Sequence, residues 1–244
     1  MINHHELSRR CFIQSMLLAV AMILIPETAY AATSYSNTGY ATANGYQYVY
    51  YASCQSYSSS ASGYMHVDVQ NGQTAPTGYV GEYVYLYRYG NLVASTGWSY
   101  NSSPCAGYTI SAHGNGTGNY HAVGYARFYN GSGYNGSSAC TTPIVQTSSK
   151  SSSSDFLAAY NDIDVSLISL IEDTDCPLIP AEGIHGEVGF VSRADLGFDQ
   201  VPASPEEALA YTESQPAIRY IPVYKQDGVT VVDEFPICRN VVSE

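Results

Sequence analysis

The chain contains little positive charge: Lys and Arg number 9 against 21 Asp and Glu, which gives a formal net charge of −12. Because binding to nucleic acid requires a basic surface that neutralises phosphates, this composition argues against a nucleic-acid partner. The sequence also lacks the Gly-rich phosphate loop, the dinucleotide fingerprint, the His-Glu-x-x-His zinc motif and the Gly-x-Ser-x-Gly nucleophile motif. These absences predict a protein that is not an enzyme and uses no cofactor.

Long apolar runs are missing too. The most marked run, Met16–Ile25, is too short to span a bilayer core of about 30 Å, so we predict no permanent transmembrane helix. It follows Arg9 and Arg10 and precedes Ala29-Tyr30-Ala31, the order of a secretory signal peptide with its cleavage site. We expect residues 1–31 to be a bacterial signal peptide and the mature protein to be secreted or cell-wall associated. The paired arginines favour twin-arginine export, with the general secretory route as the alternative.

The rest of the chain divides sharply in composition. Residues 32–148 have no net charge, whereas residues 149–244 carry a net charge of −12. The first part also holds 19 of the 24 tyrosines, among many Gly, Ser and Asn residues. We therefore predict three parts after the signal peptide: a Tyr-rich β domain at 32–146, a flexible Ser-rich linker at 147–154, and a small acidic α+β unit at 155–244.

Short alternating runs separated by turn residues predict a mainly β protein, with a β-sandwich or barrel in the Tyr-rich part. The predicted strands are Tyr46–Ala52, Gly63–Val69, Tyr79–Tyr89, Asn91–Thr96, Gly107–Ala112, Tyr120–Tyr129 and Ala139–Val145. A tight turn at Gly90-Asn91 is expected to join the third and fourth of these strands in a hairpin.

The run Tyr79–Tyr89 shows the clearest alternation. Tyrosines occupy one face, opposite a largely aliphatic face, because successive side chains of a strand point to opposite sides. One interpretation is cross-strand aromatic packing, which stabilises sheets. The other is a flat aromatic platform that binds sugar rings or peptides. On the second interpretation, the ligand contacts are Tyr83, Tyr85, Tyr87, Tyr89 and Trp98.

The histidines of the Tyr-rich part do not predict a metal site. His66, His113 and His121 lack the spacing of a closed zinc motif, so we expect ordinary strand and loop histidines. In Gly63–Val69, His66 shares a face with Tyr64 and Asp68, opposite the apolar side chains.

Five cysteines follow the expected cleavage site, and export would bring them into an oxidising compartment where disulfides persist. The disulfide candidates are Cys54, Cys105, Cys140, Cys176 and Cys238. We expect one pair among the first three and a second between Cys176 and Cys238, with one cysteine left over.

The acidic part predicts two helices and a hairpin. Residues 155–173 have apolar side chains at helical spacing, and Ser204-Pro205-Glu206-Glu207 is a strong helix start that predicts a helix to about Thr212. Ala217–Tyr224 and Val229–Phe235 are expected to pair around Asp227-Gly228. Acidic residues between 162 and 175 lack the loop pattern of a calcium site, so a solvated acidic face is preferred.

Two stretches resemble known sequences. The motifs Gly78-Tyr79-Val80-Gly81, Gly97-Trp98-Ser99-Tyr100-Asn101-Ser102 and Phe128-Tyr129-Asn130-Gly131 resemble uncharacterised secreted proteins of Gram-positive bacteria. Gly183–Leu196 is similar to the closing hairpin of bacterial SH3-like modules, and Gly189–Phe235 to C-terminal tails of secreted clostridial proteins of unknown function. These resemblances imply a β-rich exported protein and bring no catalytic residue.

Our leading hypothesis is a non-enzymatic binding module of the cell surface or cell wall, with wall glycan or peptide as its partner. One alternative is a secreted effector or bacteriocin-like protein that acts on other cells. Another is an extracellular hydrolase that uses dispersed carboxylates such as Asp68 and Glu82.

Overall fold

The computed structural model describes residues 31–147 and 177–243, and this part of the chain is mainly β, as predicted. The described residues belong to one compact unit. The predicted signal peptide, nearly all of the Ser-rich linker and the helix expected at 155–173 lie outside the described residues.

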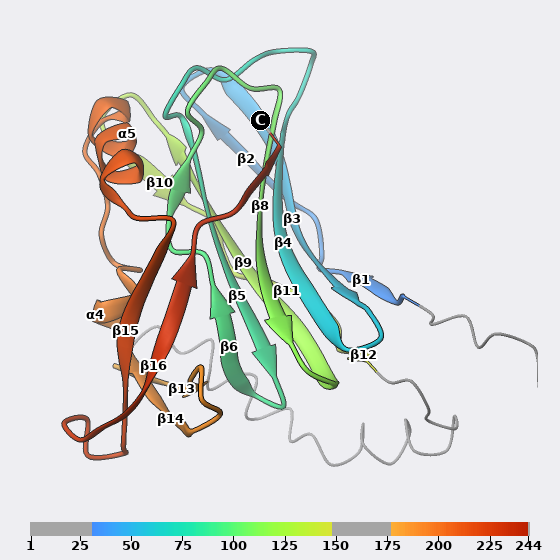
Figure 1. Ribbon diagram of the computed structural model, residues 1–244. Helices are drawn as coiled ribbons and strands as arrows, with labels where there is room; N and C mark the ends of the chain where they lie inside the picture. Colours follow the sequence, from blue (N-terminus) through green and yellow to red (C-terminus); the bar gives the residue numbers. More distant parts are fainter. Residues whose placement is uncertain (1–30, 148–176, 244) are drawn as a thin grey trace, which may run out of the picture. The chain divides into compact units, whose positions relative to one another are not determined.

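The first of two sheets has six strands in the order β1-β3-β4-β8-β17, with β2 also paired to β3. All of these neighbours are antiparallel. The last strand of the chain thus lies at one edge of a sheet built otherwise from N-terminal residues (Figure 1). The strands are β1 (Thr33–Tyr35), β2 (Gly39–Ala43), β3 (Tyr46–Ser56), β4 (Ser60–Val69), β8 (Gly107–Asn115) and β17 (Val241–Ser243).

The second sheet has eleven strands and combines both halves of the sequence. Its β6 pairs in parallel with β13 and with β16, so the C-terminal strands lie beside it (Figure 1). The strands are β5 (Val80–Arg88), β6 (Asn91–Ser95), β7 (Ser99–Tyr100), β9 (Gly118–Tyr129), β10 (Tyr134–Gly136), β11 (Cys140–Thr141), β12 (Val145–Thr147), β13 (Leu178–Glu182), β14 (Val188–Ser192), β15 (Ile218–Tyr224) and β16 (Val231–Cys238).

The pairing corrects the predicted division of the chain. Residues 177–243 do not form a separate small α+β unit, because their strands β13 to β16 extend the sheet of β5, β6 and β9 and β17 joins the other sheet. The change in composition near residue 148 therefore does not mark a boundary between two independent cores.

Local signals in the C-terminal part are confirmed. Helix α5 (Pro205–Ser214) begins after Ser204, whose hydroxyl accepts a hydrogen bond from the Glu207 amide at 3.3 Å, and it ends two residues beyond the predicted Thr212. A shorter helix, α4 (Arg193–Leu196), follows β14. Strands β15 and β16 pair around the predicted turn, in which the Asp227 carboxylate accepts hydrogen bonds from two following amides.

The first core lies between the two sheets. Met65 and Ile110 come from the six-stranded sheet, and Val84, Leu86 and Phe128 from the other, and all five are almost completely buried. The aliphatic face predicted for Tyr79–Tyr89 is therefore confirmed as a core face. Burial of such side chains contributes about 1.5–3 kcal/mol each, so this layer is a main source of stability.

The second core lies on the opposite side of β5. Tyr83, Tyr85 and Tyr87 are buried there against side chains of the C-terminal part, such as Leu196 and Phe235. Both faces of β5 are thus covered, which makes it a central strand of the fold.

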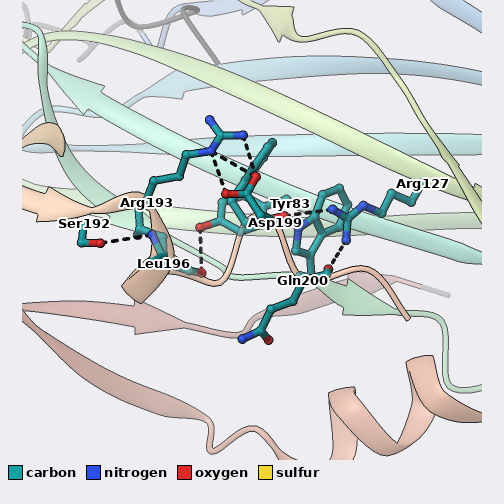
Figure 2. A network of polar contacts seen from close by, with 10 residues as sticks. Tyr83, Arg127, Ser192, Arg193, Leu196, Asp199 and Gln200 are labelled. Atoms are coloured by element: carbon teal, nitrogen blue, oxygen red, sulfur yellow. Dashed lines mark hydrogen bonds and ion pairs between the residues drawn. The ribbon is translucent and has the colours of Figure 1, made fainter. Parts of the chain in front are cut away.

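A polar network holds the turn after α4 against this second core (Figure 2). The Arg127 guanidinium donates hydrogen bonds to the carbonyl oxygens of Phe198, at 2.9 Å, and Gln200. It also lies over the Trp98 ring, 3.8 Å from the ring centroid, and the Trp98 indole N–H donates to the Phe198 carbonyl at 2.8 Å. Arg193 forms a bidentate ion pair with the Asp199 carboxylate. These contacts tie the C-terminal part to β9 and to the segment after β6.

The turn between β5 and β6 contains Tyr89 and Gly90, one residue earlier than predicted, with φ angles of 50° and 82°. Positive φ at both central residues indicates a type I′ turn, for which Asn-Gly is the preferred sequence. Because Tyr89 is unfavourable there, Tyr89→Asn is expected to raise the free energy of unfolding by about 0.5–1 kcal/mol. Urea denaturation measures the change. The control Tyr35→Asn, at a strand position, is expected to cause no gain in the free energy of unfolding. A lower free energy of unfolding in Tyr89→Asn would contradict the assigned turn.

Candidate functional site

The residues predicted to form a ligand platform are mostly inside the protein. The exposed fractions are 0% for Tyr83, 4% for Tyr85, 1% for Tyr87 and 3% for Trp98, whereas Tyr89 in the turn is 65% exposed. The prediction of an open platform on this face is wrong for the first four, because residues 177–243 of the same chain cover it. Their burial agrees with the other interpretation of the tyrosine alternation, which is aromatic packing that stabilises the sheet.

Tyr83 and Trp98 use their polar groups internally, whereas the buried Tyr85 hydroxyl has no hydrogen-bond partner among the described residues. Tyr83 accepts a hydrogen bond from the Ser95 hydroxyl at 3.0 Å. It donates to the Leu196 carbonyl at 3.4 Å (Figure 2). Burial raises the pKa of the Tyr83 phenol far above its ordinary value. These rings therefore act as core side chains.

A different aromatic surface is open: the outer face of the six-stranded sheet. Strand register places Tyr51 of β3 beside His66 of β4, and His66 beside Thr109 of β8. In the next row along the strands, Ser53 of β3 lies between Tyr35 of β1 and Tyr64 of β4. Since alternate residues of each strand face the core, these side chains all point away from it.

Four rings on this face form what we name the outer aromatic row: Tyr35, Tyr51, His66 and Tyr64. The ring centroids are 6.1 Å apart for Tyr35 and Tyr51, and 4.6 Å apart for Tyr51 and His66. The Tyr64 centroid lies 5.9 Å from that of His66. The row crosses three strands without interruption. Tyr35 is 60% exposed, and the other three rings are half-buried.

His66 is fixed at the centre of the row by two hydroxyl groups. Its Nε2 lies 2.9 Å from the Ser53 hydroxyl and its Nδ1 lies 3.3 Å from the Thr109 hydroxyl. Burial lowers the pKa of His66, and the nearby Asp68 carboxylate opposes this shift only in part. A neutral imidazole therefore stacks in the row, with one nitrogen donating and the other accepting.

Further tyrosines and few charges surround the row. Tyr40 on β2 is 76% exposed, and Tyr57 in the turn after β3 is 38% exposed and donates to Gln55 at 3.2 Å. Asp68 is the one carboxylate on the outer face of the described strands β1, β2, β3, β4, β8 and β17. The surface is thus aromatic and rich in hydroxyl groups, with little charge.

The carboxylates considered for a hydrolase are not placed as a pair. Asp68 is exposed on the outer face, whereas Glu82 is completely buried on the core side of β5. The six-stranded sheet separates them, so the two groups do not face one substrate.

His66, His113 and His121 each have different contact partners and do not form one site. His113 contacts the Ser62 hydroxyl at 3.0 Å, and His121 is buried in a stack on Tyr87 with a centroid distance of 4.9 Å. Burial lowers the pKa of His121 to about 4. In the described residues, no group of three or more His, Cys, Asp or Glu side chains is arranged to hold a metal ion.

The predicted disulfides are not formed in the structure. Cys54, Cys140 and Cys238 carry free thiols, which leaves no pair among the first three candidates and none between Cys176 and Cys238. Cys105 is buried in the loop before β8, and Cys176 lies outside the described residues. Burial raises the pKa of Cys54 to about 12 and that of Cys140 to about 11, so these thiols are unreactive at neutral pH.

Comparisons with known proteins add no family: the chain matches no family model, no curated protein and no solved structure. Across residues 31–147 and 177–243, no helix combines the length and the apolar character required to cross a membrane.

Proposed function

We propose that the protein is an exported, non-enzymatic binding module of the cell surface or cell wall, and that the outer aromatic row binds neutral wall glycan. The observation that carries this proposal is a continuous row of four rings on an open sheet face with a single carboxylate nearby. The signal-peptide pattern of residues 1–31 supports export.

The chemistry of the row suits sugars. Rings that combine an apolar body with a polar tip favour contact with the C–H groups of a pyranose while their hydroxyls exchange hydrogen bonds with its hydroxyls. The exposed rings of Tyr35 and Tyr40 offer apolar surface. Tyr51 and Tyr64, held side by side with His66, offer phenol groups at fixed spacing. A scarcity of charge favours a neutral polymer over an acidic or basic one.

The test removes two rings of the row. The double variant Tyr51→Ala, Tyr64→Ala is expected to bind purified cell walls and their neutral oligosaccharides roughly five- to 150-fold more weakly, since each lost aromatic contact contributes roughly 0.5–1.5 kcal/mol. Co-sedimentation measures retention on walls, and isothermal titration measures oligosaccharide affinity. Circular dichroism verifies that the variant is folded.

The matched control removes two tyrosines from elsewhere on the surface. Tyr220 is 54% exposed on β15, and Tyr224 lies on the same face of that strand. Tyr220→Ala with Tyr224→Ala is expected to leave binding unchanged. Equal loss in both double variants, or full binding by the row variant, would rule out the row as the binding surface.

A further inference from the structure

Strand β2 is an edge of the six-stranded sheet that no other strand covers. Within the described residues it pairs with β3 alone, and β1 pairs with β3 farther along, opposite Ser53–Gln55. An edge strand has unused backbone N–H and C=O groups that can pair with another chain, and Lys, Pro or a bulge usually protects it. The sequence of β2, Gly-Tyr-Ala-Thr-Ala, contains neither Lys nor Pro, and its register with β3 has no bulge.

The turn between β2 and β3 shows which backbone groups of β2 are free. Its two central residues, Asn44 and Gly45, have φ angles of 46° and 84°, as in a type I′ turn. The residues on either side of such a turn are hydrogen-bonded to each other, and hydrogen-bonded pairs then alternate with non-hydrogen-bonded pairs. Counting back from Ala43, which adjoins the turn, the N–H and C=O groups of Tyr40 and Thr42 point away from β3.

This edge is also free of charge in an otherwise acidic protein. Residues 32–67 contain no Asp, Glu, Lys or Arg, whereas residues 149–244 carry a net charge of −12. Two copies of so acidic a chain repel each other, and the repulsion is weakest where neither surface is charged. The exposed side chains of β2, Tyr40 and Thr42, are uncharged and compatible with cross-strand pairing.

We propose that β2 pairs with β2 of a second copy of this chain, antiparallel and with two-fold symmetry. The axis passes beside Ala41, so the outward backbone groups of Tyr40 in each copy bond those of Thr42 in the other. One segment serves both copies, as in the isologous interfaces of most protein dimers. Because a strand of five residues forms a small contact, the dimer is weak, with a dissociation constant of roughly 10–100 μM.

The pairing brings two outer aromatic rows onto one surface. A side chain at Gly39 would lie 2.3 Å from the buried Tyr50 ring, so Gly39 faces the core and the next residue, Tyr40, faces outward. Opposite residues of an antiparallel pair point to the same side, so the outer faces of the two sheets coincide. Two rows on one surface bind a polymer with higher avidity than one. Only this consequence rests on the proposed glycan binding.

Sedimentation velocity at protein concentrations of about 5–500 μM measures the self-association. Thr42→Pro removes an outward N–H and leaves the hydrogen bonds to β3 in place, since edge strands tolerate proline there. Thr42→Lys adds a like charge close to the axis in both copies. Each variant is expected to weaken dimerisation at least about tenfold. Ser243→Lys adds the same charge to exposed β17, at the opposite edge of the same sheet, and is expected to change nothing.

Three results would overturn the proposal. The first is a monomer at every concentration. The second is an unchanged dimer in Thr42→Lys, which would place the interface elsewhere. The third is equal weakening by Thr42→Lys and Ser243→Lys, which would indicate a general effect of charge. Circular dichroism verifies that each variant is folded, and Thr42→Lys, at an exposed position, decides the question if Thr42→Pro does not fold. Because sedimentation uses no glycan, its result is independent of wall binding.

Discussion

Trp98→Ala is expected to lower the free energy of unfolding by about 3–5 kcal/mol, the usual effect of truncating a large buried aromatic side chain. Trp98 is 3% exposed and lies 5.4 Å from the Tyr83 ring and 5.8 Å from the Phe198 ring, measured between centroids. The truncation also removes the surface on which the Arg127 guanidinium rests and the indole N–H bonded to Phe198. Urea denaturation followed by far-ultraviolet circular dichroism measures the loss without relying on tryptophan fluorescence.

Two further variants separate packing from hydrogen bonding. Trp98→Phe keeps an aromatic ring and is expected to lose less, because the Phe198 carbonyl keeps its hydrogen bond from Arg127. Tyr35→Ala, on the exposed row, is expected to change stability by less than about 0.5 kcal/mol. A stable Trp98→Ala variant that loses wall binding would contradict this assignment and restore Trp98 as a ligand contact.

The sequence predicted the two faces of β5 correctly and the environment of one of them incorrectly. Alternation assigns Tyr83 and Val84 to opposite sides of the strand, and the structure confirms it. Alternation carries no information on what packs against each side. The cover over Tyr83 comes from residues about 100 positions later, and such long-range parallel pairing of β6 with β13 and β16 leaves no local pattern.

Only part of the outer aromatic row could be predicted from the sequence. The alternation in β4 placed Tyr64, His66 and Asp68 together on the polar face, opposite Met65 and Val67. Tyr51 belongs to an equally clear strand, but joining it to His66 requires the register between β3 and β4, which turn residues alone did not give. The tyrosines of β5 were wrongly predicted to form an exposed platform, because the density of a residue type in the sequence does not indicate whether those side chains are exposed.

The disulfide pairs predicted from the cysteine count are wrong, and the reason is physical. Spacing and compartment predict that thiols pair, but pairing also requires the two side chains to approach within a few ångströms with suitable orientation. Cys54 instead occupies a core position of β3, where it packs as a small apolar side chain.

Glu82 is the least expected residue in the core, and it predicts an unusual dependence of stability on pH. It is completely buried between the sheets, its Oε2 accepts a hydrogen bond from the Ile110 amide at 3.1 Å, and its Oε1 has no hydrogen-bond partner among the described residues. Burial raises the pKa of this carboxyl well above its ordinary value of 4.5, and the Asp68 charge adds to the shift, while the Ile110 amide opposes it.

The sign of the effect follows from proton binding. Above pH 4.5 the unfolded chain loses the Glu82 proton while the folded protein keeps it, so the stabilising contribution is complete below that pH and is lost as the pH rises. Asp233 behaves in the opposite way. Burial would raise its pKa, but hydrogen bonds from His185 and from the amides of Glu234, His185 and Glu187 outweigh it and lower the pKa, so its contribution is lost as the pH falls.

Glu82→Gln keeps the shape of the side chain and removes its titration. The variant is expected to match the unaltered protein at pH 4 and to exceed its free energy of unfolding by more than about 1 kcal/mol at pH 8, because no buried group must then hold or lose a proton. Asp233→Asn, the control, is expected to be destabilised at pH 7 and to approach the unaltered protein on acidification. Urea denaturation at pH 4, 6 and 8 measures both. If the stability difference for Glu82→Gln stays constant with pH, then Glu82 does not retain its proton in the folded core, and the unpartnered Oε1 must be hydrated.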